Sequence, residues 1–85
     1  MSDNRIFYAN SPEATAFAVN FGHNFSRRRK AKGFTLKALA SKTALSVNTI
    51  SNAERGTVCC SLYTAHLLAH AIKMPLSDLI KPSEN

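Results

Sequence analysis

Acidic residues are scarce in this chain of 85 residues, where five Asp and Glu stand against 11 Lys and Arg. Only three His are present, and no nucleophile lies at a readable spacing from a base, so an enzyme is the poorest interpretation. No apolar run approaches the ~20 residues of a membrane-spanning helix, and residues 1–14 lack the charged-then-apolar order of a signal peptide. We therefore expect a cytoplasmic protein with no cofactor and no membrane partner.

Cysteine is rarer still, and the two cysteines, Cys59 and Cys60, are neighbours. Adjacent cysteines rarely bridge, because the ring would be strained. Two reduced thiols in a loop are the plainest interpretation. A redox pair, or a metal site completed by His66 and His70, is the alternative. The spacing does not match the usual zinc finger, so we expect no metal.

Most of the charged residues are basic. The formal net charge of +6 favours polyanionic partners, and at this length these are DNA, RNA or an acidic protein. A chain of this size makes one domain with a small core. Packing between helices, or a partner subunit, must therefore supply much of the stability.

Helix signals recur along the chain, and strand signals are weak. Ser11-Pro12-Glu13 is typical of a helix start. It is followed either by one helix to Lys32 or by two helices with a break near residues 20–22. Three further helices are expected to begin at caps, and a short fifth follows Met74-Pro75; the expected caps are Thr35, Ser46 and Ser61. In the first helix, Ala14, Phe17, Phe21 and Phe25 fall near one face. The residues expected to face the core in the later helices are Leu36, Leu39, Ala40, Thr43, Ile50, Ala53, Leu62, Ala65, Leu68, Ala69 and Ile72. The fold class is therefore all-α.

The ungapped pattern from Phe21 to about Ile80 resembles the helix-turn-helix domain of the Cro and CI phage repressors and their bacterial relatives. The matching positions are Phe25, Arg29, Gly33, Phe34-Thr35, Leu39-Ala40, Leu45-Ser46, Ile50-Ser51, Glu54-Arg55-Gly56, Leu62, Ala69, Ile72, Leu79 and Ile80. This resemblance implies a compact five-helix, lambda-repressor-like DNA-binding domain at residues 21–81. Residues 1–20 would form a partly helical N-terminal extension, and residues 82–85 a frayed tail.

Four positions depart from the family pattern. Leu36 replaces a Gln that touches a phosphate, and Ala53 replaces a bulky residue. Ala44 and Lys73 stand where the family has Gly, so we expect Ala44 to adopt a different or slightly strained turn.

The helix that begins at Val47 is the expected recognition helix. At about 100° per residue, Ile50 and Ala53 point inward, and Asn48 and Asn52 lie on the opposite side. An Asn amide matches N6 and N7 of adenine, and Val47 could meet a thymine methyl, so A·T-leaning base contacts are expected. The family resemblance places base readers at the same positions, although taken alone Asn48 and Asn52 could be solvated surface amides. The phosphate contacts expected around them are Thr35, Lys37, Lys42, Thr49, Ser51, Arg55 and Thr57.

One basic residue has a different assignment. The resemblance implies an ion pair between Arg29 and Glu54 that ties the first helix to the third. Arg27, Arg28 and Lys30 remain, either as a solvated face or as a source of long-range attraction to DNA.

A homodimer is expected, because two-fold pairing places two recognition helices about 34–36 Å apart on one face of DNA. The dimer candidates are Leu76, Leu79, Ile80 and Phe17, with Phe7 and Tyr8 as N-terminal alternatives. Arg5 could instead lie along the minor groove. The leading hypothesis is a sequence-specific regulator of transcription on the nucleoid, most simply a repressor that binds a palindromic operator. The alternatives are an antitoxin that represses its own operon together with a toxin, and a basic adaptor for protein or RNA.

Overall fold

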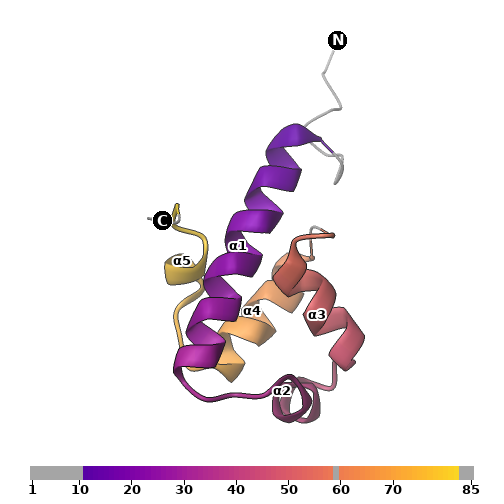
Figure 1. Ribbon diagram of the computed structural model, residues 1–85, viewed down its shortest axis with the longest axis vertical. Helices are drawn as coiled ribbons and strands as arrows, with labels where there is room; N and C mark the ends of the chain where they lie inside the picture. The colour runs from indigo at the N-terminus through magenta and orange to yellow at the C-terminus, as the bar shows by residue number, and fades with distance from the viewer. Residues whose placement is uncertain (1–10, 59, 83–85) are drawn as a thin grey trace.

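The computed structural model describes residues 11–58 and 60–82 of the chain. These residues form five α-helices and no strand, which confirms the all-α prediction (Figure 1). The helices are α1 (Pro12–Ala31), α2 (Leu36–Thr43), α3 (Val47–Arg55), α4 (Leu62–Ala71) and α5 (Leu76–Leu79).

Four of the five helices begin at a hydroxyl cap, as the sequence predicted. In each, the side-chain oxygen of the capping residue accepts a hydrogen bond of 3.0–3.1 Å from the amide three residues later. The capping residues are Ser11, Thr35, Ser46 and Ser61. The short helix α5 follows Pro75 and has no side-chain cap.

Helix α1 is continuous over 20 residues, so the single-helix alternative is correct. Its first turns project beyond the other helices (Figure 1), and the boundary expected at residue 20 falls inside the helix. The predictions for Arg5, Phe7 and Tyr8, and for the tail beyond Pro82, lie outside the described residues.

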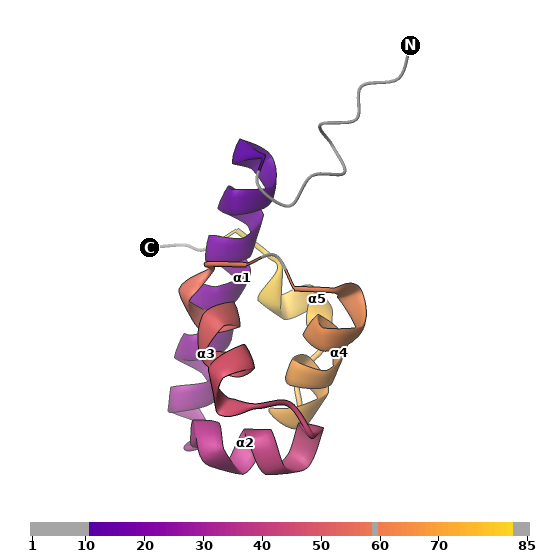
Figure 2. The same cartoon turned by 90° about the vertical axis from the view of Figure 1, so that its right-hand side faces the viewer.

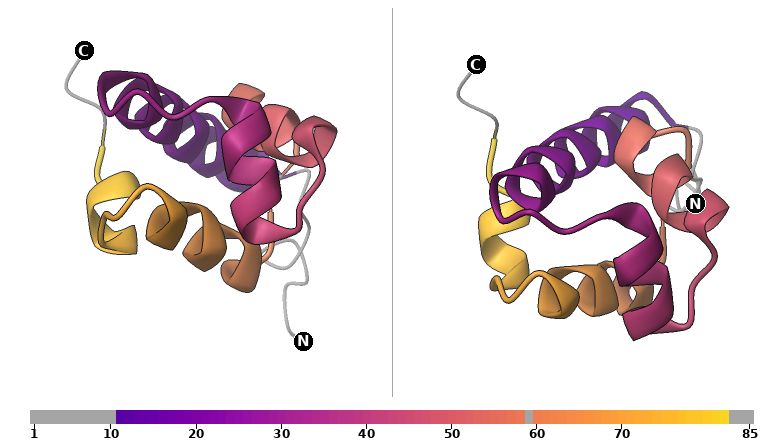
Figure 3. Two further views of the ribbon diagram at one scale, coloured as in Figure 1. Left: turned by 90° about the horizontal axis from the view of Figure 1, so that it is seen from below. Right: turned by 60° about the horizontal axis from the view of Figure 1, so that its bottom comes forward.

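The core lies where the five helices converge. Helix α1 packs against α3 and α5, while α2 packs against α3 and α4. Seen from below, α2 bridges the space between α1 and α4 (Figure 3). The large side chains that the chain buries completely are Phe25, Leu39, Ile50, Leu68, Ile72 and Leu79.

Two of the expected positions are wrong. Leu79 was a dimer candidate, but its side chain is fully buried, because α5 packs against both α1 and α4. Leu62 was expected in the core, yet it is 77 % exposed at the first position of α4. Phe17, a dimer candidate near the same face of α1 as Phe21, is 51 % exposed.

Candidate nucleic-acid interface

One side of helix α3 is polar and faces solvent, and the opposite side is apolar and packs against the core. Ile50 is fully buried and Ala53 is 2 % exposed, so these two side chains fix the helix to the core. Asn48 and Arg55 are exposed, and Asn52 is half-buried. Figure 2 looks onto the side of the molecule on which α3 lies. The structure therefore brings the predicted base readers to one open face.

The turn before α3 has a well-defined geometry. Ala44 ends α2 in the left-handed region at φ 63°, which is the strained conformation expected where the family has Gly. The Thr43 hydroxyl donates to the Leu39 carbonyl at 2.8 Å and accepts from the Leu45 amide at 3.2 Å. These bonds hold the chain between α2 and α3, and so set the direction in which α3 leaves the turn.

The Arg29–Glu54 ion pair is present and ties α1 to α3. Arg29 Nε donates to Glu54 Oε2, and Nη2 donates to Oε1 at 3.2 Å. Both side chains are about 90 % covered, and the third nitrogen, Nη1, donates to the Phe34 carbonyl at 2.8 Å. One guanidinium thus connects α1, the loop before α2, and α3. Its role is structural, and it is not available to a phosphate.

Gly22 lets α1 approach α3 very closely. A Cβ at this position would lie 2.5 Å from the carbonyl oxygen of Glu54 and nearer still to that of Ala53. Only a residue without a side chain fits there. The small Ala53 that departs from the family pattern is 2 % exposed, so its neighbours cover it.

Arg55 positions the amide of Asn52. Its Nη2 donates to Asn52 Oδ1 at 2.5 Å, and its Nη1 donates to Ser51 Oγ at 2.8 Å. Arg55 occupies one lone pair of Oδ1 and leaves the second lone pair and both N–H groups of Asn52 free for a base. The Asn48 side chain makes no hydrogen bond within the part of the chain that the structure describes. Of the two predicted base readers, Asn52 is therefore held in place by Arg55, and Asn48 is free to rotate.

The hydroxyl residues expected to contact phosphates differ in whether their oxygen accepts, or their proton is donated, within the chain. The oxygens of Thr35, Thr49 and Ser51 each accept a bond from within the chain, from the Ala38 amide, Ser46 Oγ and Arg55 Nη1, respectively. Each keeps its proton to donate to a phosphate oxygen.

Thr57 differs from the other three hydroxyl residues. Its hydroxyl donates to the Asn52 carbonyl at 3.2 Å, closing the end of α3, so its proton is already used and its predicted phosphate contact is not supported.

Lys42 makes contacts within the chain that the sequence analysis did not predict. Its ammonium donates to the Ala71 carbonyl at 3.4 Å and lies 5.1 Å from the centre of the Phe34 ring. Lys37 and Lys42 are five residues apart, or about 140° around α2, so they lie on different sides of this helix. Lys42 instead neutralises the carbonyl end of α4, a position that favours a cation.

Two structural side chains escaped the sequence analysis. Lys32, from the basic run, donates to the Ile72 carbonyl at 2.9 Å, at the same end of α4. Asn24 is 4 % exposed and donates to the carbonyls of Leu79 and Lys81 at 2.9 and 2.8 Å, which fixes α5 to α1. An amide within the apolar face of α1 was the available signal for Asn24. Arg27, Arg28 and Lys30 are exposed.

The alternative metal site gains no geometric support. Among the described residues, no group of three or more His, Cys, Asp and Glu could hold a metal ion. Cys59 lies outside these residues, Cys60 lines an apolar groove, and the rings of His66 and His70 stack on the exposed side of α4. None of these residues lies among the predicted base readers.

A family model for the helix-turn-helix matches residues 26–79. The chain belongs to this helix-turn-helix family. The crystal structure of the restriction-modification controller protein C.AhdI from Aeromonas hydrophila is similar, with a TM-score of 0.70 and 31 % sequence identity. The match covers 75 % of this chain and 97 % of that one. A comparison with curated proteins finds no significant match.

The family membership confirms the resemblance to Cro- and CI-type regulators. This helix-turn-helix protein is a sequence-specific DNA-binding transcriptional regulator. Double-stranded DNA is accordingly its partner. Within the described residues, no helix is both long and apolar enough to cross a membrane.

Proposed function

We propose that this helix-turn-helix regulator is a repressor that binds a palindromic operator as a homodimer, with α3 in the major groove. The observation that supports this most is the amide pair on the open face of α3. Asn48 is unengaged and Asn52 is oriented by Arg55, while Ile50 and Ala53 hold the helix from behind. Such an arrangement offers preformed hydrogen-bonding groups to base edges.

Adenine is the base that suits these amides. Its major-groove edge carries the N6 donor beside the N7 acceptor, and an Asn side chain can satisfy both. The free lone pair on Asn52 Oδ1 would accept from N6, and Nδ2 would donate to N7. Val47 is 43 % exposed at the start of α3, where it can meet a thymine methyl. Asn48 and Asn52 are therefore proposed to read A·T pairs, with Val47 beside them.

Backbone contacts are proposed for the rim of the same face. Thr35 and Lys37 lie at the start of α2, where free amides favour an anion. Thr49, Ser51 and Arg55 flank the base readers. These groups set the register of α3 on the duplex without reading its sequence.

Two copies are proposed because one α3 covers only a few base pairs. Two-fold pairing would place a second α3 about 34–36 Å away, on the next turn of the same DNA face. Repression then follows if the operator overlaps a promoter. The likeness to C.AhdI favours a more specific role, in which the regulator controls restriction-modification genes, including its own. The antitoxin alternative would instead require a toxin that co-purifies with the chain.

The test is a binding titration across a salt series. Labelled DNA from directly upstream of the gene is compared with scrambled DNA of equal length. We expect a preference of about 1000-fold or more, the margin common among specific binders. Transcription from the upstream fragment should fall as the protein saturates this DNA. A rise in transcription would identify an activator.

Two variants separate base reading from phosphate contact. Combining Asn48→Ala with Asn52→Ala should remove the preference but leave the binding of scrambled DNA unchanged. Lys37→Ala is the matched control. It should weaken the binding of both DNAs equally and reduce the salt slope by about one for each copy, or about two for the proposed homodimer. If the double variant keeps its preference, α3 does not read the operator through these amides.

A further inference from the structure

Two of the chain's three histidines, His66 and His70, lie one turn apart on the outer side of α4. Both side chains are exposed, their ring centres are 6.1 Å apart, and the angle between the ring planes is 25°. Tyr63 continues the same row, with its ring centre 6.4 Å from that of His66. Residues four apart share one face of a helix, so α4 itself brings the two imidazoles together. Below, His66 and His70 are called the histidine pair.

The spacing of the histidine pair suits a shared metal ion. Imidazole nitrogens bind transition-metal ions at about 2.0–2.1 Å, which places the ion about 3 Å from each ring centre. A tetrahedral angle at the ion then requires ring centres about 5 Å apart, or about 1 Å closer than the 6.1 Å of the structure. Rotation of the two side chains supplies this difference, because exposed side chains rotate within picoseconds to nanoseconds and displace no buried atom.

The donor atoms and the surrounding charge determine which ions fit. Among the residues that the structure describes, no third His, Cys, Asp or Glu joins the pair, so Mg²⁺ and Ca²⁺ lack the oxygen ligands that they need. Lys42 and Lys73 lie beside His70, so attraction between opposite charges does not hold a cation here. Coordination by neutral imidazole must hold it instead. Imidazole suits Cu²⁺, Ni²⁺ and Zn²⁺, with Cu²⁺ bound most tightly.

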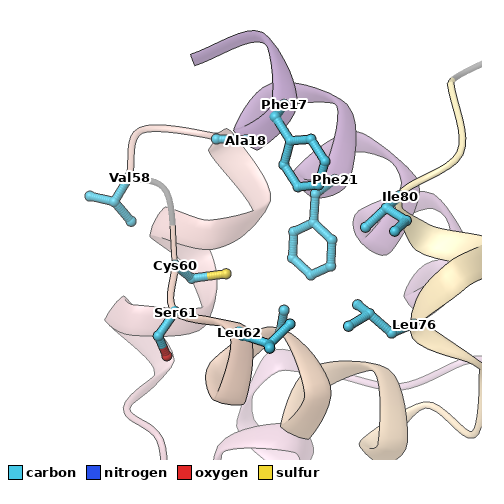
Figure 4. Close-up of a pocket in the computed structure, with 10 residues that line it drawn as sticks. Phe17, Ala18, Phe21, Val58, Cys60, Ser61, Leu62, Leu76 and Ile80 are labelled. Carbon is cyan, nitrogen blue, oxygen red and sulfur yellow. The ribbon is translucent and has the colours of Figure 1, made fainter. Parts of the chain in front are cut away.

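The remaining coordination positions have room for water. His70 lines a hollow of about 370 Å³ together with Lys42 and Lys73, which holds several water molecules at about 30 Å³ each. The Cys60 thiol belongs to a different surface. Figure 4 shows its sulfur directed into an apolar groove that Leu62 also lines, and neither member of the histidine pair lines that groove.

We propose that the histidine pair is a binding site for a divalent transition-metal ion of the Cu²⁺, Ni²⁺ and Zn²⁺ class, with water completing the coordination. The expectation of no metal rested on the spacing of the cysteines, which this site does not use. Helix α4 carries none of the proposed DNA contacts, so metal binding is a property separate from operator binding. The two imidazoles are aligned only when α4 is helical, so the ion binds the folded state and stabilises it.

The test is calorimetric titration of the full chain, free of any affinity tag, with Ni²⁺ as the probe because it does not oxidise thiols. We expect one ion for each chain. His66→Ala and His70→Ala should each weaken binding by about 10–100-fold or more, since the loss of even an outer partner of a metal ligand costs this much. His23→Ala is the matched control. It removes an exposed histidine from α1 and leaves the pair intact, so it should bind Ni²⁺ as the wild type does.

Two further measurements identify the ligands and the folded-state preference. Paramagnetic Ni²⁺ should broaden the nuclear magnetic resonance signals of the His66 and His70 rings at ratios that leave the His23 ring sharp. In urea denaturation, Ni²⁺ at 100 times its dissociation constant should raise the folding equilibrium constant of the wild type by up to about 100-fold. The same Ni²⁺ concentration should have no such effect on His70→Ala. Circular dichroism should show that the variants keep the helix content of the wild type.

Four outcomes would overturn the inference. If the wild type binds no Ni²⁺ at millimolar concentration, the histidine pair is not a metal site. If both alanine variants bind Ni²⁺ as tightly as the wild type, the ion lies elsewhere. If only one of them binds more weakly, a single imidazole holds the ion and the pair is not a chelate. If Cys60→Ser abolishes binding while the histidine variants do not, the thiol is the ligand.

Discussion

Replacing Gly22 by Ala should destabilise the protein, although Ala is normally the better residue within a helix. Helix propensity alone favours the substitution by up to about 1 kcal/mol. The added Cβ, however, would lie 2.5 Å from the Glu54 carbonyl oxygen and closer to that of Ala53. Ordinary contact distances are about 3.5 Å, so α1 and α3 would have to separate by about 1 Å.

The magnitude follows from what must move. Both clashing atoms belong to the backbone of α3, so no side-chain rotation can relieve the contact. Overpacking of this kind costs about 1–3 kcal/mol and sometimes more. Separation would also stretch the Arg29–Glu54 ion pair, which joins the same two helices. After allowing for helix propensity, we expect a net loss of about 2 kcal/mol or more, and a fall in melting temperature of at least about 8 °C.

Urea denaturation followed by circular dichroism measures this loss, and two variants calibrate it. Ala16→Gly, at an exposed site in α1, reports the helix propensity alone and should cost about 1 kcal/mol. Gly33→Ala introduces a Cβ with no atom within 4 Å, so it reports only the backbone cost at φ 81°. If Gly22→Ala is as stable as the wild type, the close approach of α1 to α3 is wrong.

Three further predictions concern the same region. Ala44→Gly should raise the unfolding free energy by about 0.5–1 kcal/mol in urea denaturation, because φ is 63° there; no gain would mean that the turn is not left-handed. Glu54→Gln should cost about 3 kcal/mol in the same assay, because it leaves the Arg29 guanidinium covered without a counter-charge; a loss below about 1 kcal/mol would show that the pair is solvated. Arg55→Lys keeps the charge but not the two-nitrogen contact with Ser51 and Asn52, so affinity for the upstream DNA should fall about tenfold. Binding of scrambled DNA should not change, and an equal fall for both DNAs would assign Arg55 to phosphate contact alone.

Local signals explain why the helices could be predicted. A hydroxyl cap acts within three residues of its own chain, so Ser11, Thr35, Ser46 and Ser61 were readable without knowing the tertiary structure. The face of α3 was also readable, since helical periodicity separates Ile50 from the amides.

The burial of individual side chains and the direction of their hydrogen bonds could not be predicted from local signals. Periodicity gives the side of a helix on which a residue lies, but not where the covering helices end. Leu62 therefore seemed buried and Leu79 available, while the structure shows the reverse. The sequence shows hydroxyls near a phosphate path, but not whether each donates within the chain, as that of Thr57 does. The bond from Lys42 to the end of α4 was not predicted, because that acceptor is distant in sequence.

Three features of the structure together constrain the orientation of α3. Gly22 sets its distance from α1, Glu54 fixes it to Arg29, and the left-handed Ala44 sets its angle to α2. A recognition helix held from three directions has little freedom to lose when it enters the major groove, so less of the contact energy is spent on ordering it. Substitutions at these three positions should therefore weaken specific binding more than phosphate binding, because base hydrogen bonds depend on orientation and the attraction between charges hardly does.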